Sequence, residues 1–138
     1  MKPQPRQASR QRQLLRELGS RYHKIVEGIL PARELLKGSV YELRTRCGKP
    51  SCHCAASAGE RHATTVLSWS EQGKTRLRTV APEDRVRLRA LTENYRRFRR
   101  ARAQLVEVHR QILRWVDALE RAVRVAAPRP AAKKGRRH

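Results

Sequence analysis

Hydrophobic and polar residues alternate with a helical period in the first part of the chain. From Ser9, apolar residues recur at spacings of three and four, as in an amphipathic helix with Ser9 as its N-cap. The residues of this stripe are Leu15, Leu18, Tyr22, Ile25 and Ile29. Pro31 lacks the backbone donor that an interior helical position needs. It therefore either ends this helix or begins a second short helix over residues 32–37, for which Gly38 is a natural stop.

The pattern changes in the middle of the chain. Three segments carry Val, Leu, Thr and aromatic residues with partial alternation, as strands do: residues 40–47, 62–69 and 75–80. The last two are joined by residues 70–74, in which Gly73 suits the left-handed conformation that a hairpin loop requires. We therefore predict a three-stranded antiparallel meander.

A long helix is expected after the meander. Residues 81–84 are a helix-start signal with a proline and two acids, and the helix is expected to run to about Val125. Its apolar seam has two lines at heptad spacing, which is typical of a coiled coil. One line is Leu91, Phe98, Leu105, Ile112 and Leu119, and the other is Tyr95, Arg102, His109, Val116 and Val123. We expect the first helix to pack antiparallel on the C-terminal half of the long helix, leaving Val108 and Trp115 for a second copy of the chain.

Together these elements predict an α+β fold that is mainly helical. An N-terminal helix and a long, coiled-coil-like C-terminal helix flank a small three-stranded meander with a cysteine-rich loop. We expect one domain over residues 9–125, with residues 1–8 and the basic residues 126–138 disordered. The sequence shows no secretory signal and no apolar run of the roughly 20 residues that a membrane span needs, so we expect a cytoplasmic protein.

All three cysteines lie between the first two predicted strands, with the spacing C-x4-C-x-C-x7-H. Zn²⁺ prefers four tetrahedral ligands drawn from thiolate and imidazole groups. The candidate ligands are Cys47, Cys52, Cys54 and His62. His53 is the competing imidazole, but its place between two cysteines makes the ring geometry awkward. Gly48 and Pro50 allow a tight loop, and we predict a structural zinc ion there; three free thiols are the alternative.

The strong positive charge of the chain indicates a class of binding partner. The chain has 33 Lys+Arg against 12 Asp+Glu and a net charge of +21, so a polyanion is its natural partner and a merely solvated surface is the alternative. Arginine forks suit phosphates. The candidate phosphate ligands are Arg44, Arg46, Lys49, Arg76, Arg78, Arg85, Arg89, Arg96, Arg97, Arg99 and Arg100. The long-helix arginines are expected beside the cysteine loop. Tail residues that add general affinity are Lys133, Lys134, Arg136 and Arg137.

These features predict a nucleic-acid-binding protein with an accessory or regulatory role, and DNA is favoured over RNA. The alternative is a coiled-coil interaction module that binds an acidic protein partner. We expect no enzyme, because the sequence contains no paired carboxylates, nucleophile motif or phosphate-binding loop. No membrane partner is expected, and the long helix offers a surface for a homodimer.

The run CGKPSCHCA, followed by GERHATTVLSW, GKTRLRTV and NYRRFR, resembles an uncharacterised family of small basic bacterial proteins with a CGKxxCxC signature. The resemblance covers about residues 38–119, and the cysteine run is its most specific part. The family is known only as a domain of unknown function, often near mobile elements, so the resemblance implies a fold and no established activity. Family members often follow the histidine with Gly-Pro, whereas Ala63-Thr64 follows His62 here. The conformation at the start of this strand is therefore not carried over from the family.

Overall fold

The structure, a computed structural model, describes residues 5–46, 48–55 and 62–132. The chain forms two compact units. One unit combines the described residues up to Val26 with those from Gln104 onward, and the other spans Glu27–Ala103. Whether both units unfold together, as one domain over residues 9–125 implies, stays a prediction. None of the helices in the described ranges is long and apolar enough to cross a lipid bilayer.

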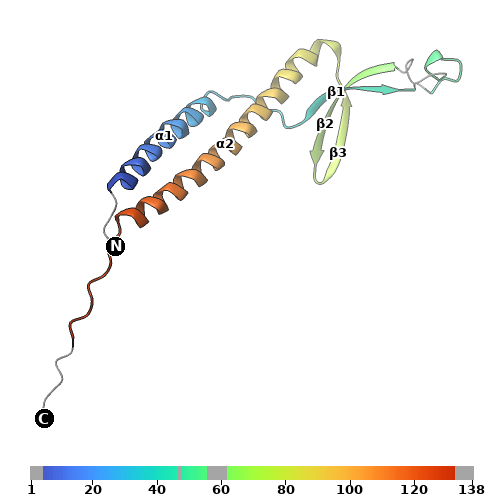
Figure 1. Cartoon of the computed structure of the whole chain (residues 1–138). Helices are drawn as coiled ribbons and strands as arrows, with labels where there is room; N and C mark the ends of the chain where they lie inside the picture. Colours follow the sequence, from blue (N-terminus) through green and yellow to red (C-terminus); the bar gives the residue numbers. More distant parts are fainter. Residues whose placement is uncertain (1–4, 47, 56–61, 133–138) are drawn as a thin grey trace. The chain divides into compact units, whose positions relative to one another are not determined.

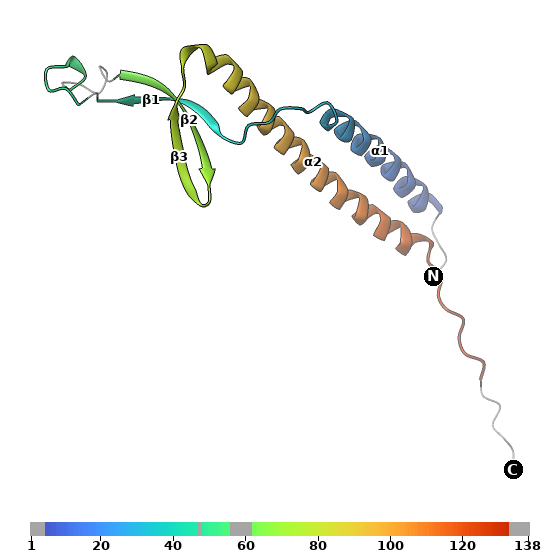
Figure 2. The same cartoon turned by 180° about the vertical axis from the view of Figure 1, so that it is seen from behind.

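The first unit is built from two helices that lie side by side. α1 (Pro5–Ile29) runs alongside the C-terminal half of α2 (Arg85–Val123) in the opposite direction, as predicted (Figure 1 and Figure 2). The predicted apolar stripe of α1 is covered along its length, and Leu18 is buried. The helix begins at Pro5 rather than near Ser9. Proline is well tolerated in a first helical turn, and Ala8, only 3% exposed, is buried by this earlier start.

One line of the α2 seam lies one residue earlier than predicted. The covered residues of that line are Ala101, Val108, Trp115 and Ala122, and Val108 is only 1% exposed. Four residues of the predicted line are exposed instead: Arg102, His109, Val116 and Val123. Burying Arg102 and His109 would take two polar side chains out of water without giving either one a hydrogen-bonding partner. Val108 and Trp115 therefore belong to the core of the unit and are not left for a second copy.

α2 starts and ends close to the predicted positions. A short 3-10 turn, η3 (Pro82–Asp84), precedes it and carries the two expected acids near the positive end of the helix dipole. The helix ends at Val123, two residues before the expected end.

The second unit contains the predicted meander, with strand order β1-β2-β3 and antiparallel neighbours throughout. The strands are β1 (Ser39–Thr45), β2 (His62–Glu71) and β3 (Lys74–Thr79), each within two residues of the prediction. Gln72 and Gly73 connect β2 to β3 with φ angles of 50° and 77°, the two positive values that a type I′ hairpin turn needs. The core of the sheet is small: Val66 and Val80 are buried, and the Val80 amide donates to the Thr65 carbonyl at 2.9 Å.

A segment without regular structure connects α1 to β1. α1 ends at Ile29, just before Pro31, so the proline ends the first helix. The alternative of a second helix over residues 32–37 is wrong. In its place, the Leu36 amide donates a hydrogen bond to the Leu91 carbonyl of α2 at 3.2 Å, which satisfies a backbone group that a helix would have used internally.

Gly38 lies in this segment immediately before β1 and does not stop a helix. A Cβ atom here would lie 2.8 Å from the Ser68 carbonyl oxygen and 3.2 Å from the Leu67 Cδ1 atom. Real Cβ atoms do not approach a carbonyl oxygen so closely, so glycine is what lets the chain pass β2 at this point.

Candidate nucleic-acid interface and metal loop

The cysteine-rich loop closes the β1–β2 hairpin. The register pairs Thr45 with His62, so the loop begins and ends where two neighbouring strands meet. Gly48, at a φ of 82°, makes the tight turn expected of it. The Sγ atom of Cys52 lies 3.2 Å from the Nε2 atom of His62. Thiolate and imidazole ligands of one tetrahedral Zn²⁺ lie about 3.6 Å apart, given Zn–S and Zn–N bonds of about 2.3 and 2.05 Å. The two side chains are therefore close enough to share a metal ion.

The remaining expected ligands lie around this pair in the sequence. Cys54 belongs to the one-turn helix η1 (His53–Ala55), and Cys47 lies outside the described residues. The rings of His53 and His62 have their centroids 5.8 Å apart. Within the residues that the structure describes, no three potential ligands come together. The contact with Cys52 favours His62 over His53 as the imidazole ligand.

Five arginines form a stripe along one side of the first half of α2. At about 100° per residue they fall within about 100° of one another around the helix axis, and they span about 22 Å along it. These residues, called the arginine stripe, are Arg85, Arg89, Arg96, Arg99 and Arg100. Arg85 is half-buried with its Nε atom covered, and Thr92, which falls within the same arc of the helix, is only 1% exposed. The other four arginines are exposed and span about 16 Å of the helix. The stripe is therefore an ordered row of cationic side chains on a rigid element.

Glu93 lies at the edge of the arginine stripe and pairs with two of its members. Its carboxylate oxygens are 3.0 Å from Nη2 of Arg100 and 3.7 Å from Nη1 of Arg96. Ion pairs as exposed as these stabilise a fold by only about 0.5 kcal/mol each. Among the acids that the structure describes, none pairs with Arg89 or Arg99.

A second basic surface lies on one face of the sheet. Cross-strand partners share a face, and the register sets Arg76 beside Trp69 and Arg78 beside Leu67. Strand alternation then places Arg44 and Lys74 on the same face. We call this surface the basic sheet face, after its members Arg44, Trp69, Lys74, Arg76 and Arg78. Glu42 and Glu71 lie on the same face, and Glu42 is 3.9 Å from Arg44.

Trp69 is the residue of this surface that sequence reasoning missed. Its Nε1 atom donates to Oε2 of Glu71 at 3.3 Å, and the same oxygen lies 4.0 Å from Nε of Arg76. An indole ring beside a guanidinium group is a surface on which a nucleobase can stack. The signal was present in the hairpin itself, since Trp69 and Arg76 form the third residue pair from the Gln72-Gly73 turn.

Three of the predicted phosphate ligands belong to neither surface. Arg97 lies on another side of α2, where Nη2 donates to Oδ1 of Asn94 at 3.0 Å. Arg46 and Lys49 are exposed in the sequence that leads into and along the cysteine loop. The basic tail residues from Lys133 onward lie outside the described residues.

The cysteine loop and the arginine stripe are separate sites. β3 ends level with Val66, which is four residues along β2 from His62. At about 3.3 Å per residue, the chain therefore leaves the sheet toward α2 about 13 Å from the loop. The single surface that we expected from the sequence divides into distinct parts.

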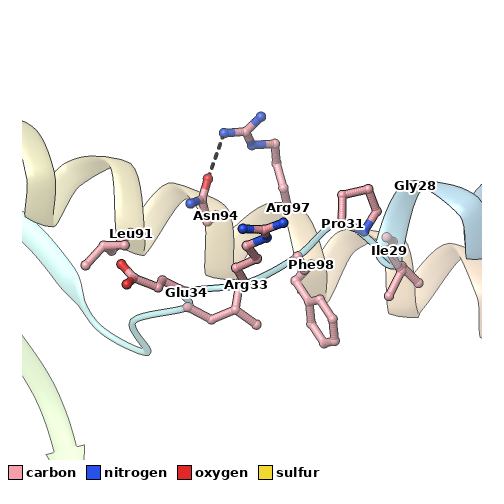
Figure 3. Close-up of a pocket in the computed structure, with 12 residues that line it drawn as sticks. Gly28, Ile29, Pro31, Arg33, Glu34, Leu91, Asn94, Arg97 and Phe98 are labelled. Carbon is pink, nitrogen blue, oxygen red and sulfur yellow. Dashed lines mark hydrogen bonds between the residues drawn. The ribbon is translucent and has the colours of Figure 1, made fainter.

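A cavity of about 540 Å³ lies between the connecting segment and the first half of α2 (Figure 3). Ile29, Pro31, Leu91 and Phe98 are among its apolar lining residues, and Arg33 and Arg97 are among the polar ones. In Figure 3 the Arg97 side chain turns toward Asn94, and the Phe98 ring points in the opposite direction from the Arg97 side chain. The volume is within the range of small-molecule pockets, about 300–1,000 Å³. Phe98 is half-buried and lines this cavity.

The comparison with known families adds a classification. A family model described as "Domain of unknown function (DUF6788)" matches residues 7–90, more than half of the 138 residues. No curated protein and no solved structure gives a significant match. The matched range starts and ends earlier than the expected residues 38–119. It includes α1 from its third residue, the sheet and the cysteine loop, but only the first two arginines of the stripe. The chain therefore belongs to the DUF6788 family, a domain family of unknown function.

Proposed function

We propose that the protein binds nucleic acid in an accessory or regulatory role in the cytoplasm, with DNA preferred over RNA. The observation that carries this proposal is the arginine stripe, a row of guanidinium groups on one side of a rigid helix. Duplex DNA carries one negative charge for about every 1.7 Å of its axis, so the four exposed arginines of the stripe, which span about 16 Å, meet several phosphates. Planar guanidinium forks bind phosphate oxygens strongly and read no sequence.

The basic sheet face supports the same proposal. Phosphate contacts position a protein on nucleic acid, whereas exposed aromatic rings contact bases. Trp69 is half-buried, so it presents a partly exposed ring next to the Arg76 cation. This pairing suits unstacked bases, so the sheet is the part of the protein that could bind a single-stranded or distorted segment.

We also propose a structural Zn²⁺ in the cysteine loop, held by the Cys3His set Cys47, Cys52, Cys54 and His62. The 3.2 Å separation of Cys52 and His62 supports it. A bound metal would supply folding free energy to a sheet that buries few side chains. The role proposed for the metal is structural and that of the protein is binding rather than catalysis.

Fluorescence anisotropy with labelled duplex DNA, single-stranded DNA and an RNA hairpin tests nucleic-acid binding. The protein is first freed of co-purified nucleic acid at high salt. We expect all three probes to bind at low salt and duplex DNA to outcompete the RNA hairpin. Failure of all three to bind at about 50 mM salt would contradict the proposal, because counterion release makes such binding strongest there. RNA that outcompetes DNA would reverse the stated preference.

Metal analysis of the purified chain tests the zinc site. We expect about one equivalent of zinc per chain, lost in Cys52→Ser and retained in the neighbouring control Ser51→Ala. Wild-type protein with fewer than about half an equivalent would reject a structural site, because such sites bind zinc tightly at neutral pH.

A coiled-coil module that binds an acidic protein partner is the second candidate. The exposed apolar residues of α2, Leu113 and Val116 among them, support it, because apolar helix faces bind other helices. Co-purification of a stoichiometric acidic protein without nucleic acid would favour it. With either candidate, we propose that a second copy of the chain binds through α2.

A further inference from the structure

A second apolar line runs along the C-terminal half of α2, beside the seam that packs against α1. Its members, called the outer line, follow spacings of three and four, as heptad a and d positions do. They are Val106, His109, Leu113, Val116, Glu120 and Val123. The four apolar members are 38%, 50%, 44% and 40% exposed in that order. Among the residues of this unit that the structure describes, α1 therefore leaves the outer line without a partner.

We infer that the outer line is an interface between two copies of this chain whose α2 helices run antiparallel. A two-fold axis sets Leu113 of one copy opposite Val116 of the second copy. The same register sets Val106 opposite Val123 of the second copy. Every exposed apolar residue of the outer line then meets another, over about 26 Å of helix. The polar members of the line fall between these layers.

The charged residues select this orientation. In the antiparallel register His109 lies opposite Glu120 of the second copy, where an imidazole can donate to a carboxylate. Arg110 lies within about 3 Å, along the axis, of the level of Asp117 of the second copy. Symmetry repeats both pairs. A parallel, in-register pairing would instead set Glu120 against Glu120 within the seam, and like charges there oppose association.

A second copy suits this surface better than an acidic helix does. The outer line contains Glu120 and is flanked by Asp117 as well as by Arg110 and Arg124. An acidic partner would set like charges against the two carboxylates. The second copy instead brings a basic or imidazole group to each carboxylate and an acid to Arg110, so its charges are complementary.

The inference specifies the second copy named in the proposed function and rests on that part of it alone. Neither the arginine stripe nor the cysteine loop contributes to the outer line. Self-association measured without nucleic acid can therefore fail while nucleic-acid binding persists, and the reverse can also occur.

Sedimentation equilibrium of the full chain, freed of nucleic acid and held at fixed ionic strength, tests the inference. We expect a concentration-dependent dimer that Leu113→Glu abolishes. Arg110→Asp or Asp117→Arg alone should raise the dissociation constant roughly tenfold, because each creates like-charge pairs across the two-fold axis. The double variant R110D/D117R restores opposite charges in the antiparallel register, so its constant should return to within about threefold of wild type.

Arg16→Asp is the matched control, since it makes the same charge change at an exposed position on α1 and should leave the constant unchanged. Circular dichroism verifies that each variant keeps its helix content, and Val116→Lys replaces Leu113→Glu if the latter unfolds. A wild type that stays monomeric at every concentration overturns the inference. A double variant that dimerises no better than the single variants overturns it as well, because only the antiparallel register predicts rescue.

Discussion

Substituting Arg89 and Arg99 by glutamine removes two exposed guanidinium groups from the arginine stripe without breaking an ion pair to any described acid. Glutamine keeps a long polar side chain and has nearly the helix propensity of arginine. The double substitution therefore removes two positive charges and leaves the helix largely unchanged. If the stripe binds phosphates, each lost guanidinium group removes one phosphate contact and the counterion that it releases.

The expected size of the effect follows from this count. Each phosphate contact on duplex DNA contributes about 0.9 to the negative slope of log K against log salt. The four exposed stripe arginines would together account for a slope of about −3.6, and the double variant should lose about 1.8 of it. When salt rises from about 50 to 200 mM, the affinity of both proteins falls. The factor by which it falls should be about 12 times smaller for the double variant than for wild type.

Anisotropy titrations of one duplex at four or more salt concentrations measure this slope. The control is Arg12→Gln with Arg16→Gln, which makes the same charge change at exposed positions on α1. We expect the control slope to match wild type. An unchanged slope in the stripe variant, or an equal reduction in the control, would refute the stripe as the binding surface and would leave only diffuse attraction by the net charge of +21.

Urea denaturation checks three predictions about the fold. Gly38→Ala should lower the free energy of unfolding by about 1–3 kcal/mol, because the added Cβ clashes with β2. Gly19→Ala is the control: its Cβ has open space, so it should raise the free energy of unfolding by about 0.5–1 kcal/mol. A Gly38→Ala variant as stable as wild type would disprove the close approach. Gln72→Asn should stabilise by roughly 0.5–1 kcal/mol because asparagine tolerates a positive φ better, and a loss would argue against the type I′ turn. Val108→Ala should cost about 2–3 kcal/mol and Val106→Ala less than about 1 kcal/mol, so equal losses would contradict the observed seam.

Local patterns predict the elements of this fold because each pattern needs only neighbours in sequence. Strand alternation and the position of Gly73 suffice for the meander, and the three-four spacing suffices for both helices. The α2 seam needs more, because α1 can lie on either side of the line through Leu105 and Ile112. Ala101 and Ala122 carry little hydrophobic signal, so Val108 and Trp115 look like two isolated apolar residues that are left for a second copy. Where α1 lies is decided by packing of the whole unit.

The candidate site is predictable in composition but only partly in arrangement. Cys52 and His62 meet because the ends of two neighbouring strands meet, which the strand prediction already implies. Arg96 and Arg97 look equivalent in sequence, yet they differ by about 100° around α2, and only one belongs to the arginine stripe. Identifying Trp69 as a stacking candidate requires knowing that it lies opposite Arg76. That pairing depends on the exact length of the hairpin turn, which a general pattern of strands does not give.

Glu93 gives the arginine stripe an internal competitor for phosphate. Its carboxylate, 3.0 Å from Arg100 and 3.7 Å from Arg96, occupies guanidinium edges that a phosphate would use. Under the proposed function, a phosphate that binds the stripe displaces the Glu93 carboxylate. When the phosphate leaves, the carboxylate returns, so the two guanidinium groups are not left unpaired. Such exchange shortens the lifetime of a complex more than it slows its formation, because interface changes act mainly on dissociation rates. A protein with this feature exchanges readily between neighbouring sites on a polyanion, as sliding and hopping require.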